Sequence, residues 1–435
     1  MQPCVDDVAD ELDALSFEST VTTASGNWAA PASLALSSTK PHMKSGDLCW
    51  DAIRRARSAD PSLGGLRVIR QLGSGDIGNV YLVELKCAGG CVFAAKVMDK
   101  KELEGRDKER RARTERGILE LLDHPFLPTL YATLDSPRWC CLLTEFCPGG
   151  DLHILRERQP EKRFDAAAVR FYASEVVVAL EYLHMLGIVY RDLKPENILV
   201  RADGHIMLTD FDLCLSSTSM AQIVSDHQHK QIPPLSSDRG SIDPSSTNSD
   251  CMPPSCIAPA VSWFRPKRKR RRNRPGPRGS QLAIVAEPMD ARSMSFVGTY
   301  EYLAPEIILG EGHGSAVDWW TLGIFIFEFF YGVTPFKGTD QEHTLANIVA
   351  RALEFPKKPP LAEPAKDLIT RLLIKDPKKR MGSTMGATAI KRHPFFDGVN
   401  WVLLRGVTPP FLPRRMAYQT SVARDDFPDV SIEYY

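Results

Sequence analysis

Residues 190–197 read Tyr-Arg-Asp-Leu-Lys-Pro-Glu-Asn, and a second acidic stretch, Asp210-Phe211-Asp212, begins thirteen positions after Asn197. The first stretch places an acid, Asp192, two residues before a lysine, Lys194, and five before the asparagine. Either stretch alone would be an ordinary polar loop that satisfies its own backbone. The two in this order favour a reactive site, provided that the chain also supplies a phosphate loop, a lysine for the phosphates and an acid to hold that lysine.

A glycine-rich turn supplies the first of these. Gly73-Ser74-Gly75-Asp76-Ile77-Gly78-Asn79-Val80 lies between two β-rich runs, 67–72 and 79–83. Its glycines let backbone N–H groups approach phosphate oxygens, although a turn of this kind is by itself a weak signal. A third apolar run, 91–97, contains Lys96, where an unpaired charge would be costly. Three acids on the charged segment 101–122 could pair with it: Glu109, Glu115 and Glu120.

Length and composition set the class of protein. The chain has 435 residues, of which 43% are apolar and 25% charged, as in an ordinary globular protein of two or three domain-sized units. The formal net charge is zero, but residues 265–278 carry nine Lys or Arg and no acid, which leaves the remainder at −9. The first thirty residues hold six acids and no Lys or Arg. This asymmetry indicates a local anionic partner.

Cysteines and apolar runs indicate a soluble intracellular chain. The ten cysteines show no paired C-x-x-C motifs, so we expect reduced thiols and no zinc site. The segment 1–14 is acidic, unlike a signal peptide. The most apolar stretch, 321–336, is interrupted by Glu328 and is shorter than the ~20 residues that a membrane span needs.

Periodicity divides the chain into a small β-rich part and a larger helical part. Residues 1 to about 45 lack a sustained period, and we expect 1–65 to be a mostly disordered extension. The segment 101–122 indicates a helix with one buried end, and a strand over 140–146 ends at a Pro-Gly-Gly hinge. Three later stretches have helical spacing: 166–185, 318–331 and 365–374. Residues 215–290 read as an insertion, and 397–435 as an extended tail.

From Leu66 to Phe396 the chain resembles a protein kinase. Ala304-Pro305-Glu306 looks like the Ala-Pro-Glu of that family, with Arg380 as its buried partner. Asp318, Trp320 and Gly323 are similar to the helix that supports the catalytic loop. The resemblance implies a two-lobed α+β fold, with a β-rich N-lobe, a larger helical C-lobe and ATP in the cleft beneath the glycine-rich turn.

The resemblance also implies roles for individual residues. Asp192 would accept or orient the proton of the substrate hydroxyl, and Lys194 would neutralise charge on the γ-phosphate. Lys96 would pair with the α- and β-phosphates, and Glu115 best matches the position that holds this lysine.

Metal and adenine ligands follow from the same comparison. Asn197 and Asp210 would ligate Mg²⁺, which prefers oxygen ligands. The adenine would meet backbone groups at Glu145 and Cys147, with Thr144 at the back of the pocket. The implied cofactors are therefore ATP and Mg²⁺.

Further features narrow the resemblance. Lys194 with Thr299 resembles the serine/threonine pattern, and both the 295–299 block and His393-Pro394-Phe395-Phe396 are similar to AGC kinases. Asp212 stands where Gly usually follows Asp-Phe, and a long insertion comes after it. Both features resemble the plant AGC VIII kinases, the PINOID-like group that regulates auxin transport. Membrane transporters are therefore possible substrates.

The family also implies regulation and substrate choice. Ser295 matches an activation-segment phosphosite, read by Arg191, and an upstream activating kinase is an implied partner. The last residues, 432–435, match the hydrophobic docking motif of AGC tails only loosely. Substrates with basic residues before the Ser or Thr are expected from carboxylates beside the bound peptide: Asp151, Glu196 and Glu328.

The basic run has three interpretations. Trp263 and Phe264 precede Lys267, Arg268, Lys269, Arg270, Arg271 and Arg272, and anionic phospholipid attracts such charges at ~1 kcal/mol each. We favour a peripheral plasma-membrane location for a cytoplasmic protein, with nuclear localisation or a solvated charge block as alternatives. The neutral overall charge argues against nucleic acid as a partner.

The alternative to an enzyme is a pseudokinase scaffold, which binds partners without transferring phosphate. Only Asp212 and the displaced activation segment suggest it.

Overall fold

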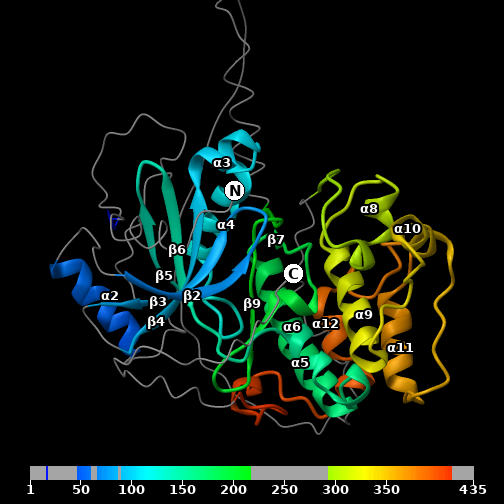
Figure 1. Cartoon of the computed structure of the whole chain (residues 1–435). Helices are drawn as coiled ribbons and strands as arrows, with labels where there is room; N and C mark the ends of the chain where they lie inside the picture. The colour runs from blue at the N-terminus through cyan, green and yellow to red at the C-terminus, as the bar shows by residue number, and fades with distance from the viewer. Residues whose placement is uncertain (1–15, 18–46, 60–65, 87–89, 217–291, 414–435) are drawn as a thin grey trace, which may run out of the picture. The chain divides into compact units, whose positions relative to one another are not determined.

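The computed structural model describes residues 16–17, 47–59, 66–86, 90–216 and 292–413, all within one compact unit (Figure 1). Nearly all of the predicted disordered stretch 1–45 lies outside these residues, as do most of the insertion, its basic run and the tail end Ile432–Tyr435. Those predictions remain predictions. The expected two-lobed architecture is confirmed, with a small β-rich lobe and a larger helical lobe.

An antiparallel sheet forms the core of the small lobe. Among the described residues it has six strands in the order β1-β5-β6-β4-β3-β2. Their bounds are Ser16–Phe17 (β1), Leu66–Ser74 (β2), Asn79–Leu85 (β3), Val92–Asp99 (β4), Leu130–Asp135 (β5) and Trp139–Glu145 (β6). The three runs predicted around the glycine-rich turn are therefore strands β2, β3 and β4, and the run at 140–146 is β6. Strand β5 was not predicted.

Each face of this sheet has its own apolar cluster. On β6, Cys140 and Leu142 belong to the cluster that includes Ile118 of the helix Glu109–Leu121 (α4). The alternate residues Cys141 and Leu143 belong to a second cluster on the other face. Because side chains of a strand alternate between faces, the sheet is covered on both sides.

The helix Leu48–Ala59 (α2) covers the second face, although the extension that contains it was predicted to be mostly disordered. Asp47 precedes the helix, and its carboxylate accepts from the N–H of Cys49 at 2.9 Å and from the hydroxyl of Tyr131 at 2.9 Å. The ring of Trp50 lies 5.6 Å from that of Tyr131. The tertiary contact with the sheet, rather than helix propensity alone, thus accounts for this element.

The predicted single helix over 101–122 is instead two helices. Lys100–Gly105 (α3) is capped by the carboxylate of Asp99, and α4 starts at Glu109. Asp107, between them, has a φ of 54°, which an uninterrupted α-helix does not allow. The break separates α3 from α4, and α4 carries Glu115, which pairs with Lys96 of β4.

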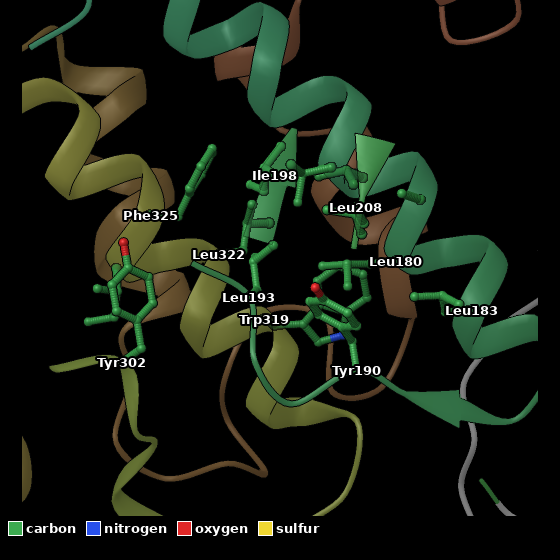
Figure 2. Close-up of a cluster of buried hydrophobic side chains, with 14 of the residues drawn as sticks. Leu180, Leu183, Tyr190, Leu193, Ile198, Leu208, Tyr302, Trp319, Leu322 and Phe325 are labelled. Carbon is green, nitrogen blue, oxygen red and sulfur yellow. The ribbon is translucent and has the colours of Figure 1, made fainter. Parts of the chain in front are cut away.

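The large lobe is built around two long helices. Its described helices are Leu152–Glu157 (α5), Ala166–Met185 (α6), Pro305–Ile308 (α8), Ala316–Tyr331 (α9), Gln341–Ala350 (α10), Glu363–Leu372 (α11) and Gly386–Lys391 (α12). Short strands pair as Ile198–Val200 (β8) with Ile206–Leu208 (β9), and Ile188–Val189 (β7) with Leu215–Ser216 (β10). Leu180 and Leu183 of α6 and Trp319, Leu322 and Phe325 of α9 pack beneath the 190–197 loop (Figure 2).

No helix among the described residues combines the length and apolarity that crossing a bilayer requires.

Candidate active site

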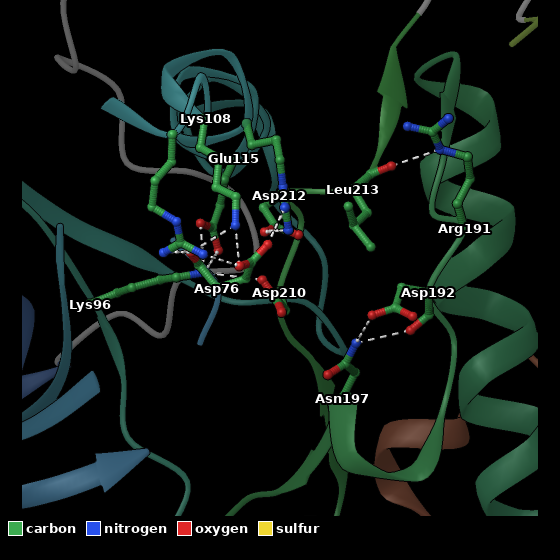
Figure 3. Close-up of polar contacts among 12 residues, drawn as sticks. Asp76, Lys96, Lys108, Glu115, Arg191, Asp192, Asn197, Asp210, Asp212 and Leu213 are labelled. Atoms are coloured by element: carbon green, nitrogen blue, oxygen red, sulfur yellow. Dashed lines mark hydrogen bonds and ion pairs between the residues drawn. The ribbon is translucent and has the colours of Figure 1, made fainter. Parts of the chain in front are cut away.

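An ion-pair cluster joins the two lobes. Lys96 on β4 lies 2.8 Å from a carboxylate oxygen of Glu115 on α4 and 3.0 Å from Asp210, which follows β9 (Figure 3). Burial alone would lower the pKa of Lys96, but the carboxylates of Asp210 and Glu115 outweigh it and raise the pKa. The lysine is therefore charged and fixed in position between Glu115 and Asp210. Of Glu109, Glu115 and Glu120, Glu115 is the one that the structure brings to Lys96.

A buried carboxylate on α9 holds the start of the 190–197 loop. Asp318 accepts from the backbone N–H of Tyr190 at 2.9 Å and of Arg191 at 2.7 Å, and the ring Nε2 of His184 lies 2.8 Å from its Oδ2. Arg191 has a φ of 70°, an uncommon conformation for a non-glycine residue. Two charge-assisted hydrogen bonds to consecutive N–H groups offset the strain of this turn.

Asp192, next in the chain, lies in a polar network. The side-chain amide of Asn197 donates to its Oδ2 at 2.9 Å, and the Thr299 hydroxyl donates to its Oδ1 at 3.2 Å. Lys194 donates to the Thr299 hydroxyl at 2.9 Å and lies 3.1 Å from Asp192. The predicted residues Asp192, Lys194, Asn197 and Thr299 are thus brought together. A substrate hydroxyl approaching Asp192 would meet a fixed acceptor and a cation.

The glycine-rich turn lies over β4. Val80 pairs with Lys96 in the β3–β4 register, so the turn and the lysine share one sheet. A Cβ on Gly78 would come within 2.4 Å of the Val97 carbonyl, whereas a Cβ on Gly73 would meet nothing within 4 Å. The N–H of Gly75 donates to the Gly78 carbonyl at 2.9 Å and closes the turn. Of Gly73, Gly75 and Gly78, only Gly78 is thus required by close packing in this conformation.

The predicted adenine contacts lie at the end of β6. Thr144 faces Ala94 across the sheet and donates to its carbonyl at 3.4 Å. Glu145 pairs with Arg201 of the large lobe at 3.2 Å, and Cys147, which is buried, follows at the connection between lobes. Glu145 and Cys147 therefore lie on the segment that joins the two lobes.

The donor set suits Mg²⁺. The amide nitrogen of Asn197 is used by Asp192, which leaves its oxygen for a ligand, and Asp210 offers carboxylate oxygens. Within the described ranges no three His, Cys, Asp or Glu gather into a metal-binding group. A site with two protein oxygens fits a metal that takes its other ligands from water and substrate phosphates, as Mg²⁺ does.

Ser295 lies against Arg191. The guanidinium donates to the hydroxyls of both Ser295, at 3.0 Å, and Ser293, at 3.1 Å, and the ring of His313 is 3.4 Å away. Burial lowers the pKa of Arg191, and the charge of Arg110 on α4 lowers it further. The guanidinium that contacts Ser295 therefore also feels the positive charge of a residue on α4. Sequence reasoning missed Arg110 and Ser293, although the dense arginines of 106–116 were a signal for the first.

The three acids expected near the substrate occupy one region but are not equally available. Asp151 is buried and caps α5 by accepting from the N–H of Ile154 at 2.7 Å. Burial raises the pKa of Glu328, which accepts from Tyr302 and lies 3.2 Å from Arg156. Burial likewise raises the pKa of Asp151, and the charge of Glu196 adds to the rise in both Asp151 and Glu328, so the three carboxylates lie near enough to interact.

Asp212, the departure from the family pattern, is paired. Its carboxylate forms an ion pair with Arg111 of α4, a contact that sequence reasoning missed because no motif links residues 101 positions apart. Among the described residues with positive φ, Asp210 is included at 59° and Asp212 is not. Asp therefore replaces glycine here without occupying a conformation reserved for glycine.

Comparison with known proteins agrees with this geometry. Residues 66–229 and 283–396 match the family described as the protein kinase domain. The chain is 53% identical over 377 residues to serine/threonine-protein kinase AGC1-5 and 51% identical over 391 residues to serine/threonine-protein kinase RHS3, both of Arabidopsis thaliana. It is 48% identical over 417 residues to protein kinase PINOID 2 of Oryza sativa subsp. japonica.

These matches extend over most of the chain. They cover 86%, 89% and 86% of it, in the same order, and 64%, 77% and 83% of the three relatives. The chain thus spans a little under two thirds of the length of AGC1-5.

Proposed function

The chain belongs to the protein kinase family, among the plant AGC serine/threonine kinases, and from this premise we propose that it transfers the γ-phosphoryl group of Mg-ATP to Ser or Thr of proteins. One observation carries the proposal: Lys96, Glu115 and Asp210 form an ion-pair cluster, as a phosphate-holding site requires. The loop with Asp192 supports it, because an acceptor for the hydroxyl proton is already oriented.

Each residue has a defined task in this reaction. The substrate oxygen bonds to the γ-phosphorus while the bond to the bridging oxygen of ADP breaks, and Asp192 receives the hydroxyl proton. Lys96 holds the α- and β-phosphates, and Lys194 neutralises charge on the transferred group. Bound Mg²⁺ would neutralise phosphate charge, with Asn197 and Asp210 as its protein ligands.

We expect basic protein substrates. Asp151, Glu196 and Glu328 share one acidic region, and Arg156 neutralises only part of it. An Arg or Lys upstream of the target hydroxyl would gain from this field. Glu196 is the most available of the three, because its ion-pair partner is the imidazole of His153, at 3.3 Å. A peptide array with no upstream basic preference would contradict this expectation.

Regulation by phosphorylation of Ser295 is the next element of the proposal. A phosphate there would add almost two negative charges beside Arg191 and Arg110, whose mutual repulsion it would relieve. An upstream activating kinase, or the protein itself, would supply this phosphate. The activation segment would then be fixed against α4.

We further propose that the protein acts at the plasma membrane, on transporters such as those of auxin. The support is the basic run Lys267–Arg272 and the resemblance to the PINOID-like group. A fluorescent fusion with these six residues neutralised should leave the cell cortex. A neutralised fusion that stays at the cortex would contradict membrane binding by the run. If the unmodified fusion is nuclear and the neutralised one is not, the run would instead be a nuclear localisation signal.

The decisive experiment measures phosphate transfer from Mg-ATP to a basic Ser/Thr peptide by the wild type and by Asp210→Asn. Transfer that the variant loses would support the proposal. Absence of transfer by the wild type, even when Ser295 carries phosphate, would contradict it and favour a scaffold that binds partners without catalysis.

A further inference from the structure

Arg111 contacts two acids that come from different parts of the chain. Its Nη1 pairs with Asp76 at the tip of the glycine-rich turn, and its Nη2 pairs with Asp212. Arg111 lies one helical turn before Glu115 on α4, so both side chains are on the same face of the helix. That face therefore has two links to the segment 210–212: Glu115 through Lys96, and Arg111 directly.

The turn is anchored at its tip by charge and by apolar contact. Asp76 accepts from Arg106 at 2.8 Å, and also from Lys108 and Arg111. Burial alone would raise the pKa of Asp76, but the hydrogen bonds from Lys108 and Arg111 lower it to about 2. The next residue, Ile77, is buried in the apolar cluster that includes Leu103 of α3. The tip of the turn is thus fixed to the α3–α4 region, not only to its own strands.

The other end of the link is less exposed to water. The side chain of Asp212 is 4% exposed, against 45% for Asp76. An unpaired charge would be costly at this buried position, so the carboxylate needs a nearby cation. Arg111 pairs with it directly, and the Nε of Arg111 has no hydrogen-bond partner among the described residues. Glycine at 212 could not make this contact.

The position of Asp212 decides what the contact holds. Phe211, one residue earlier, is buried against the ring of Tyr190 at 5.5 Å, and Asp210 reaches Lys96. An ion pair at 212 therefore restrains the segment that carries the metal ligand. The same guanidinium restrains the turn that would cover the phosphates.

We propose that Arg111 is a positioning residue that couples the glycine-rich turn to the Asp210-Phe211-Asp212 segment through α4. In this arrangement the turn and the metal ligand are held together before nucleotide arrives, and Asp212 is the residue that makes the coupling possible. This inference rests on the proposed function for its consequence in catalysis, but the coupling itself is a property of the protein without nucleotide.

The coupling can be read at two backbone amides. The Gly75 N–H donates to the Gly78 carbonyl at 2.9 Å and reports on the turn, while the Cys214 N–H donates to the Phe211 carbonyl at 3.2 Å and reports on the segment. Hydrogen exchange at both would be measured in the full chain for wild type, Asp212→Asn, Arg111→Met and the double variant. Asp212→Asn is nearly isosteric and changes a residue remote from the turn in sequence.

We expect Asp212→Asn to speed exchange at Gly75 as well as at Cys214, and to add nothing at Gly75 once Arg111 is Met. Mg-ATP binding should weaken about tenfold in Arg111→Met, corresponding to ~1.4 kcal/mol, and Arg111→Lys should restore only part of it because an ammonium lacks the fork. Arg113→Met, on the same helix, should change neither amide, because Arg113 pairs with Glu109.

Unchanged exchange at Gly75 in Asp212→Asn would overturn the coupling, as would effects of the two substitutions on Gly75 that add up in the double variant. Exchange that rises equally in the distant helix α6 would indicate general destabilisation and would also overturn it. If Arg111→Met does not fold, Asp212→Asn and Arg111→Lys still decide the matter. Failure of the wild type to transfer phosphate would contradict the proposed function alone, since exchange is measured without nucleotide.

Discussion

Ser295 and Arg191 are the pair through which a single phosphate would act. If the phosphate on Ser295 binds Arg191, the variants Ser295→Ala and Arg191→Ala should each lower kcat/KM roughly tenfold or more. Because the two substitutions remove the same interaction, kcat/KM of the double variant should be little lower than that of either single variant. Steady-state kinetics with a basic peptide would measure this. Full activity in Ser295→Ala, or losses that multiply in the double variant, would remove Ser295 from the regulatory scheme.

His313 gives a pH dependence of stability at the same place. Burial lowers the pKa of His313 to about 4, and the charge of Arg191 contributes. The unfolded chain, in which histidine has a pKa of about 6.5, then binds more protons between those values, so stability should fall as the pH drops from about 6.5 to 4. The loss would be about 2 kcal/mol after allowance for solvent screening. Urea unfolding at several pH values would show a smaller loss in His313→Asn, and an equal loss would contradict the assignment.

The turn between β2 and β3 shows how an element depends on one glycine more than on its neighbours. Gly78→Ala would push a methyl group to 2.4 Å from the Val97 carbonyl, so we expect a loss of about 1–3 kcal/mol in stability. Gly73→Ala is the matched control, since nothing lies within 4 Å of its added carbon and we expect unchanged stability. Thermal unfolding would distinguish the two. Equal unfolding midpoints for both variants would mean that the turn moves freely away from β4.

Secondary structure was predictable where the period was long and self-contained. The helix expected over 166–185 is α6 to the residue, and those expected at 318 and 365 begin two residues earlier, as α9 and α11. The helix α2 was not predicted, because its apolar residues acquire a role only against the sheet. The break in the 101–122 segment depends on one residue, Asp107, that alternating charge does not reveal.

Site residues were predictable in so far as motifs name them. The contact between Lys96 and Glu115 is the one that the kinase resemblance implies. The contacts of Asp210 with Lys96 and of Thr299 with Asp192 join residues that the motifs name, but no motif stated these pairings. Arg111 occupies no motif position, and its contacts come from two segments that only the folded chain brings together. On α4, the contact of Glu115 could therefore be predicted from the sequence, whereas the contacts of Arg111 became evident only in the structure.

The whole domain depends on a buried ion pair between segments distant in sequence. Arg380 donates to both oxygens of Glu306, at 2.7 and 2.8 Å, and each residue is 2% exposed. Glu306→Gln would leave a buried guanidinium without its countercharge, at a cost of about 3–5 kcal/mol in unfolding free energy. Urea denaturation would measure it.

An exposed ion pair provides the comparison. Arg371 and Asp367 lie 2.9 Å apart with side chains 55% and 41% exposed, so Arg371→Ala should cost less than about 1 kcal/mol. If Glu306→Gln and Arg371→Ala lower the unfolding free energy by the same amount, burial would not explain the contribution of the Arg380–Glu306 pair to stability.

The helix α2 bears on how this protein can be prepared in the laboratory. The family match begins at Leu66, yet Ala52 and Ile53 are 1% exposed and Trp50 lies against the sheet. A recombinant fragment that starts at Leu66 would lack α2 and expose the apolar face of the sheet that α2 covers, and we expect it to self-associate. A fragment that starts at Asp47 keeps this face covered and should stay monodisperse at the same concentration. For expression, crystallisation or inhibitor screening, the domain therefore begins nineteen residues before the point at which the family match would place it.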